Sequence, residues 1–359
     1  MSWNIGRVSS LQFNLLNRSF VSSATKALAT AGEELSTGFK SDIYRSLGAS
    51  AATLTSLRAS FENTEAYMTA NKTLDGKLEA MLTSVDAART SADSVLQTAI
   101  VNSSRPTSGV SELRNEARAA LESIIATLNI SYNGDYLFSG VNSDQEPLTR
   151  WSDVNEATGT SPSQVLADIV GSGPASAGEA EDMLAQIDAV FASTSGETAQ
   201  SFEGTFYRGA PALAKDGAPA PRVTARIGEG QALDYGVQAN DQGIRDVIKG
   251  LAMLASVDVG AIEDEGAYAI WMGAASAALS NGVEGMLEIS AGIGFNQQVA
   301  ENAQTRLTDL ALVQKTQISD YESVDPYEAS TRVKNLEYQL DASYSVTAKL
   351  SQLSLLNYL

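Results

Sequence analysis

The sequence contains no cysteine and no histidine among its 359 residues. Without cysteine the chain has no disulfide, no thiolate nucleophile and no sulfur-ligated metal, and without histidine it lacks the usual general base and the commonest metal ligand. These absences exclude most familiar hydrolase mechanisms. We therefore expect a protein that is not an enzyme, with no catalytic residue, no cofactor and no metal site.

Basic residues are also scarce: 24 lysines and arginines stand against 43 acidic residues, which gives a net charge of −19. A nucleic-acid binder needs a basic stripe, so we expect no nucleic-acid partner. No apolar run approaches the length of a membrane span, and Met1–Arg7 lacks the basic-then-apolar layout of a secretory signal peptide. We expect no membrane insertion and, if the chain is exported, a route without a cleaved signal.

Aromatic residues make up only 7% of the chain, while 43% is hydrophobic overall, a mixture suited to helices that pack along small side chains. Apolar residues from Ala49 to Val101 recur at steps of three and four, which predicts one long helix. Such a helix would be roughly 75 Å long, too long to be buried in a compact domain without antiparallel partners. Further helices are expected at 111–129, from Gly243, at 268–323 with a break at Gly292–Gly294, and after Asp325-Pro326, with a small hairpin at Tyr136–Gly140.

The segment from about 141 to 242 has a different composition, with six of the eight prolines and fifteen acidic residues against five basic ones. Helical periodicity fades there apart from about 179–191, and strands are expected at 204–208, 222–227 and 232–237, with turns at Lys215–Gly217 and Gly228–Gly230. The sequence thus predicts a mainly α fold, an elongated antiparallel helical bundle or coiled coil of N- and C-terminal helices with an inserted mixed β-containing domain. The expected domains are 1–44 with 325–359 (terminal coiled coil), 45–141 with 243–324 (helical rod) and 142–242 (acidic, outward-facing insertion).

Both ends of the chain carry apolar stripes at helical spacing, which we predict to be an assembly interface. Its residues are Ile5, Val8, Leu11, Leu15, Val21, Leu28, Leu35, Val333, Leu336, Leu340, Tyr344, Leu350, Leu353, Leu355, Leu356, Tyr358 and Leu359. The two stripes could simply pack on each other within a monomer. However, the last four of these residues cover more than one helical face, which favours burial by neighbouring subunits.

Other motifs have simpler explanations. Gly228–Gly230 and Gly292–Gly294 lack the following lysine and the strand-to-helix context of a phosphate loop, so they are expected to be turns or helix breaks. The acidic clusters at 179–182 and 263–265 lack the alternate spacing of a calcium loop and are expected to be solvated. Two convergent carboxylates could form a glycosidase site, but nothing in the sequence selects a pair.

Three motifs resemble one family when taken in order. Glu34–Gly38 reads ELSTG before the long helix, Tyr136–Gly140 reads YLFSG and is followed by Pro147, and Leu353–Leu359 reads LSLLNYL. Together they resemble the flagellin and hook-associated protein family, and most closely its hook–filament junction subgroup. The resemblance covers both ends of the chain and leaves the middle unmatched except near Tyr235–Asn240.

The resemblance implies a structural protein of the bacterial flagellum that joins hook to filament by polymerisation of its terminal helices. It implies as partners copies of the chain itself, a neighbouring hook-associated protein and flagellin, together with an export chaperone and the flagellar export apparatus. The implied location is the extracellular flagellum. Two alternatives stay open: flagellin itself, the filament subunit, and a carboxylate-dependent glycosidase acting on the cell wall.

Overall fold

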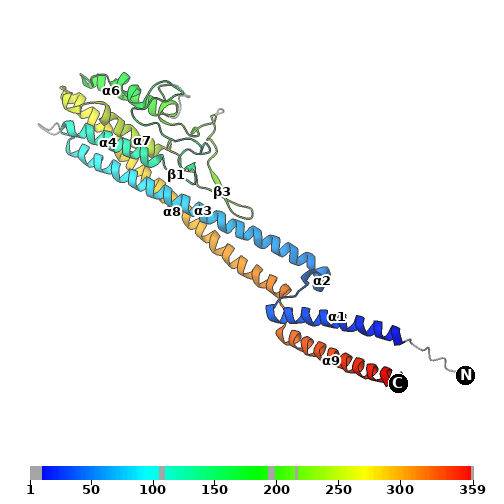
Figure 1. Cartoon of the computed structure of the whole chain (residues 1–359). Helices are drawn as coiled ribbons and strands as arrows, with labels where there is room; N and C mark the ends of the chain where they lie inside the picture. Colours follow the sequence, from blue (N-terminus) through cyan, green and yellow to red (C-terminus); the bar gives the residue numbers. More distant parts are fainter. Residues whose placement is uncertain (1–9, 105–109, 193–198, 215–216, 357–359) are drawn as a thin grey trace. The chain divides into compact units, whose positions relative to one another are not determined.

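The computed structural model describes residues 10–104, 110–192, 199–214 and 217–356 (Figure 1). Its helices are α1 (Ser10–Thr37), α2 (Ile43–Leu47), α3 (Ala51–Val101), α4 (Val110–Leu128), α5 (Pro162–Val170), α6 (Ala177–Phe191), α7 (Gln242–Ser256), α8 (Glu265–Glu322) and α9 (Pro326–Leu356). Its strands are β1 (Ser131–Tyr132), β2 (Asp135–Tyr136), β3 (Thr224–Gly228) and β4 (Gln231–Asp234). Long helices with two small antiparallel hairpins confirm the predicted mainly α fold.

The chain divides into two compact units. The terminal unit comprises Met1–Glu65 and Thr308–Leu359, and the central unit comprises Ala66–Leu307. The terminal unit contains 12 acidic and 10 basic residues, whereas the central unit contains 31 acidic and 14 basic residues. Nearly all of the surplus negative charge therefore belongs to the central unit.

The predicted start of the last helix is confirmed. Asp325 Oδ1 accepts a hydrogen bond of 2.8 Å from the amide of Tyr327, and Pro326 is the first residue of α9. This is the expected arrangement of an N-cap followed by proline, since proline lacks the amide that would otherwise need a partner. At the other end, α1 stops at Thr37 and Gly38 follows with a φ of +77°, a conformation that favours glycine.

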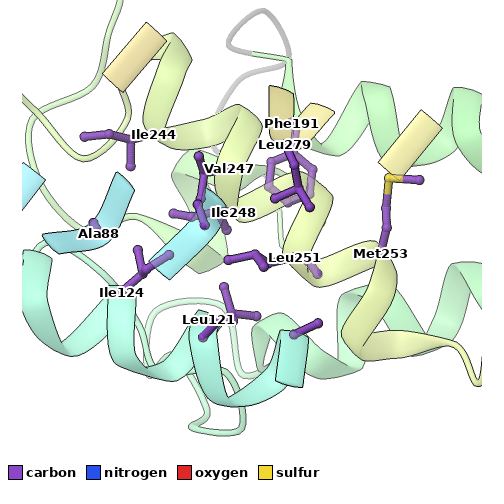
Figure 2. Packing of buried hydrophobic residues seen from close by; sticks show 14 of the residues in the cluster. Ala88, Leu121, Ile124, Phe191, Ile244, Val247, Ile248, Leu251, Met253 and Leu279 are labelled. Atoms are coloured by element: carbon purple, nitrogen blue, oxygen red, sulfur yellow. The ribbon is translucent and has the colours of Figure 1, made fainter. Parts of the chain in front are cut away.

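The core of the central unit is arranged around α7. Its apolar face is fully buried, and Figure 2 shows Val247 and Leu251 lying between Leu121 and Ile124 of α4 and Leu279 of α8. Because apolar residues occur on almost every face of α7, the helix has to be enclosed on several sides. Residues of α3, α4, α5, α6 and α8 belong to the same buried cluster.

Close approach of α7 and α8 depends on glycines. A Cβ added to Gly243 would lie 2.6 Å from the backbone carbon of Gly285, and one added to Gly282 would lie 2.5 Å from the amide nitrogen of Val247. Real Cβ atoms do not approach backbone atoms so closely. The two helix backbones can therefore be in contact only because these positions lack side chains.

The segment 142–242 contributes helices and aromatic residues to the same core. The helix expected at 179–191 is present as α6, and Phe191 of α6 packs against Phe202 and Phe206 with ring centroids 5.4 and 5.2 Å apart. The strand expected at 204–208 is wrong, because Phe202–Phe206 forms a single π-helical turn started by Ser201, whose hydroxyl accepts from the Gly204 amide. The sequence interpretation also missed α5, which begins at a Ser161-Pro162 cap.

The two hairpins agree with the sequence predictions to different degrees. β1 and β2 pair around Asn133–Gly134, so the first hairpin lies just before the predicted run at Tyr136–Gly140 and includes only its first residue. β3 and β4 pair around the predicted turn at Gly228–Gly230, with an irregularity in register between Arg226 and Gly228. The turn expected at Lys215–Gly217 falls largely outside the described residues.

The break predicted at Gly292–Gly294 is wrong. α8 continues without interruption from Glu265 to Glu322, through both glycines. A glycine inside a helix costs only about 1 kcal/mol relative to alanine, and burial of Ile293 between the two glycines offsets that cost.

Candidate assembly surface

The two striped ends of the chain form one antiparallel helix pair. α1 and α9 lie side by side (Figure 1), with Asn17 next to Thr347 near one end and Glu34 next to Arg332 near the other. Apolar residues at their interface are mostly small. Among the described side chains of the two helices, the buried apolar ones are Ala24, Ala31, Ala329 and Leu340.

The helix pair leaves large apolar side chains in solvent. On α1, Leu16 is 61% and Phe20 is 49% exposed, and on α9 the exposed fractions of Tyr338 and Tyr344 are 72% and 55%. Tyr327, at the start of α9, is 84% exposed. Each helix has therefore buried only one side of its apolar surface, and the other side is available to a further partner.

Polar contacts hold the pair together where apolar contacts are sparse. Asn17 Nδ2 donates to Thr347 Oγ1 at 2.5 Å. Glu34 is buried and accepts from two donors: Arg332 Nη1 at 3.1 Å and the backbone amide of Ser41 at 3.1 Å. Glu34 thus ties α9 to the loop that follows α1.

That loop is itself bound to the segment that joins α8 to α9. Backbone hydrogen bonds run from Lys40 to the Glu322 carbonyl and from Val324 to the Gly38 carbonyl, at 2.8 and 2.9 Å. The Lys40 ammonium donates to the Tyr321 carbonyl at 2.8 Å, which satisfies a free carbonyl at the end of α8. Both connections to the terminal helix pair are therefore fixed to each other.

An ion pair reinforces this junction inside the terminal unit. Arg58 Nη2 lies 2.5 Å from Glu322 Oε1, and its Nη1 donates to the Tyr44 hydroxyl at 3.2 Å. The hydrogen bond to Glu322 raises the pKa of Arg58. The guanidinium stays charged at any physiological pH.

The structure places the predicted interface residues in three groups. Val21, Leu28, Val333 and Leu336 are half-buried and Leu340 is buried, whereas Leu15, Leu35 and Tyr344 are exposed. Leu11, Leu350, Leu353, Leu355 and Leu356 lie in α1 or α9, but their side chains are outside the described part of the chain. Ile5, Val8, Tyr358 and Leu359 lie outside the described residues altogether.

Sequence reasoning did not select several residues that matter at this surface. Glu34 and Arg332 were not among the predicted interface residues, and they are 298 positions apart in the chain. Leu16, Phe20 and Tyr338 lie off the three-four stripe that was followed. Their signal was their residue type, because large apolar side chains on a second face of an amphipathic helix indicate a second contact.

The central unit contains polar hollows. A groove of about 490 Å³ lies between α7 and α8 and is lined by the carboxylates of Asp241, Asp246, Glu284 and Glu288. Within the described residues, no three carboxylates are grouped so that they could hold a metal ion. Asp241 is instead paired with Arg222 at 2.6 Å.

The perturbed pKa values in the central unit have structural causes. The hydrogen bond from Lys77, with a 2.8 Å separation, lowers the pKa of Asp135, and burial raises the pKa of the Tyr207 hydroxyl. Burial lowers the pKa of Arg245, whose guanidinium donates to the Phe191 carbonyl at the end of α6. These groups cap helices or join elements.

None of the helices in the described ranges combines the length and the apolar composition needed to cross a membrane.

Two family models match the sequence. Residues 8–143 match the bacterial flagellin N-terminal helical region, and residues 277–359 match the bacterial flagellin C-terminal helical region. Together they take in more than half of the chain, including the whole described part of the α1–α9 pair. Among solved structures, the chain is similar to one described as a flagellar hook-associated protein from Vibrio parahaemolyticus, at 12% identity and a TM-score of 0.49, over 76% of this chain and 97% of that one. No curated protein sequence matches the chain.

Proposed function

Because the chain belongs to the flagellin and hook-associated protein family, and is thus a structural component of the bacterial flagellum and not an enzyme, we propose that it joins the hook to the filament. In this role copies of the chain polymerise through α1 and α9, next to another hook-associated protein on one side and flagellin on the other. The location that follows is the hook–filament junction, outside the cell. The chain would reach it through the flagellar export apparatus, escorted by an export chaperone and without a cleaved signal peptide.

The observation that carries the assembly role is the incomplete burial of the α1–α9 pair. Exposed Leu16, Phe20 and Tyr338 are large enough to contribute substantially to an interface if neighbouring copies cover them, at about 25 cal/mol per Å² of apolar surface removed from water. Of the described apolar side chains, the helix pair on its own buries three alanines and one leucine, and its other valines and leucines are half-buried or exposed. Assembly would therefore supply much of the stabilisation that these two helices lack in the monomer, which is coupled folding and binding.

Charge supports the same division of roles. The terminal unit is nearly neutral, with 12 acidic and 10 basic residues, so copies of it can pack closely without strong mutual repulsion. We propose that 1–44 and 325–359 form the polymerisation domain, that 45–141 and 243–324 form the supporting rod, and that the acidic segment 142–242 faces outward. Heterologous contacts that repeat without closing into a dimer would produce a tube.

The choice of junction protein over flagellin rests on sequence motifs in this chain, the YLFSG run at 136–140 and the leucine-rich tail at 353–359. Flagellin is the second candidate, because the matching family models describe the helical ends of flagellin.

Deletion of the gene separates the two candidates. If the chain is the junction protein, the mutant makes hooks and sheds monomers of a separate flagellin into the medium, and expression of this chain restores filaments. Normal filaments in the mutant would refute the junction role. Loss of filaments with no flagellin in the medium would show that this chain is itself the filament subunit.

A further inference from the structure

We propose that Glu34 and Arg332 select the register in which α1 pairs with α9 during assembly. This inference rests on the proposed function, since it assumes that the two helices come together when the polymer forms. Its experiment reads out register and not the presence of polymer, so that the two ideas can fail separately.

The apolar contacts between α1 and α9 do not specify a unique register. On α1, a shift of seven residues places Val21 at the position of Leu28 and Ala24 at that of Ala31. On α9, the same shift places Ala329 at the position of Leu336 and Val333 at the position of Leu340. A stripe that repeats every seven residues can slide by one repeat and still place apolar or small side chains at the interface.

Glu34 breaks this repeat. Its side chain is only 11% exposed, and both oxygens are used, one by Arg332 and the other by the Ser41 amide. A carboxylate removed from water in this way is costly unless a cation and hydrogen-bond donors meet it. Among the registers that keep the seven-residue repeat, only the observed one places a cation of α9 next to Glu34.

Sliding α9 along α1 by seven residues in either direction gives two alternative registers, and the observed antiparallel pairing shows which residues would become neighbours in each. Sliding α9 one way brings Glu34 level with Asp325, a group of the same charge, and brings Asn17 level with Leu340. Sliding it the other way brings Glu34 level with Gln339 and Asn17 level with Ser354. The second register retains polar partners for Asn17 and for Glu34 but lacks the cation, so it is the main competitor of the native one.

Register can be measured by cross-linking in the full-length chain, because the sequence has no cysteine of its own. Asn17→Cys with Thr347→Cys reports the native register, and Asn17→Cys with Ser354→Cys reports the main competitor. Each pair is oxidised in assembled polymer, with and without Glu34→Gln. Cross-links within one chain and between neighbouring copies are separated by size on a denaturing gel.

With Glu34 intact, we expect the native pair to cross-link and the slipped pair to remain at background. With Glu34→Gln, or with Arg332→Gln, the ratio of slipped to native cross-links should rise at least about tenfold, the order expected when one charge-assisted hydrogen bond is lost. Glu33→Gln is the matched control: it removes an exposed carboxylate one position away and should leave the ratio unchanged. An unchanged ratio in both Glu34→Gln and Arg332→Gln polymers overturns the proposal.

If neither single variant assembles, the charge-swapped variant Glu34→Arg with Arg332→Glu tests the proposal. Native-register cross-links in its polymer support the proposal, and its failure to assemble overturns it. Failure of the wild-type chain to polymerise under any condition would instead contradict the proposed function itself.

Discussion

The contact between α7 and α8 makes a sharp prediction about glycine. Replacing Gly282 by alanine would place a Cβ 2.5 Å from the amide nitrogen and 2.6 Å from Cγ2 of Val247, and 3.0 Å from the carbonyl oxygen of Gly243. Two of these three atoms belong to the backbone of a buried helix and cannot rotate away. The helices must move apart, and the contacts of Val247 and its buried neighbours are weakened as they do so.

A matched control isolates this steric effect. Gly273 lies in the same helix and is exposed, with no atom within 4 Å of an added Cβ. Both Gly282→Ala and Gly273→Ala gain the same helix propensity, about 1 kcal/mol. Overpacking costs about 1–3 kcal/mol, so Gly282→Ala should be less stable than Gly273→Ala by about that amount. For a unit of this size the difference corresponds to roughly 2–4 °C in Tm for each kcal/mol.

Tryptophan fluorescence can follow unfolding of the central unit alone. Trp151 and Trp271 are both buried in its core, and replacing Trp3 by phenylalanine removes the remaining tryptophan. In that background we expect Gly273→Ala to unfold at a slightly higher temperature than the parent, and Gly282→Ala at a lower temperature than Gly273→Ala. Equal Tm values for the two variants would refute the argument that these helices need glycine to approach each other.

Two further predictions concern one side chain in each unit. Replacing exposed Phe20 by serine should abolish or greatly weaken polymerisation in a sedimentation assay while leaving the tryptophan-monitored Tm unchanged. The control Ser22→Ala on the same helix should change neither polymerisation nor Tm. Normal polymerisation of Phe20→Ser would contradict the assembly surface. Because Lys77 lowers the pKa of Asp135 in the folded state, the wild type should exceed Asp135→Asn in unfolding free energy at neutral pH, by less than about 1 kcal/mol for a half-exposed pair. The advantage is complete above the unfolded pKa of about 3.9 and is lost as the pH falls through the lower folded value, so a difference that grew in acid would refute the assignment.

Helical periodicity predicted the long elements well because the helices are amphipathic over many turns. The predicted helix at 49–101 begins two residues from the observed start of α3, and the Asp325-Pro326 start of α9 is present as expected. Shorter elements depend on local chemistry that periodicity does not show. The run at 204–208 satisfied a strand pattern, but its phenylalanine, Phe206, is buried against Phe191 and belongs to a π-helical turn.

The contacts within the assembly surface were beyond a pattern argument. Spacing identified which residues share a helical face, and it therefore located the stripe that contains Val21, Leu28 and Leu340. It could not show that Glu34 meets Arg332, because that contact depends on the register of two helices from opposite ends of the chain. Nor could it show that Phe20 stays exposed, since exposure is decided by which face of α1 meets α9.

The sparse packing of the terminal helices connects assembly with register. If large residues filled the α1–α9 interface, their distinct shapes would fix one register, but the pair would then need no neighbours. Alanines at Ala24, Ala31 and Ala329 leave the pair short of apolar burial and therefore dependent on further copies, and they also make slipped pairing inexpensive. A polymer built from such helices needs a contact that tolerates only one alignment. A buried carboxylate with one available cation, as in Glu34 and Arg332, provides it at the least cost in apolar surface.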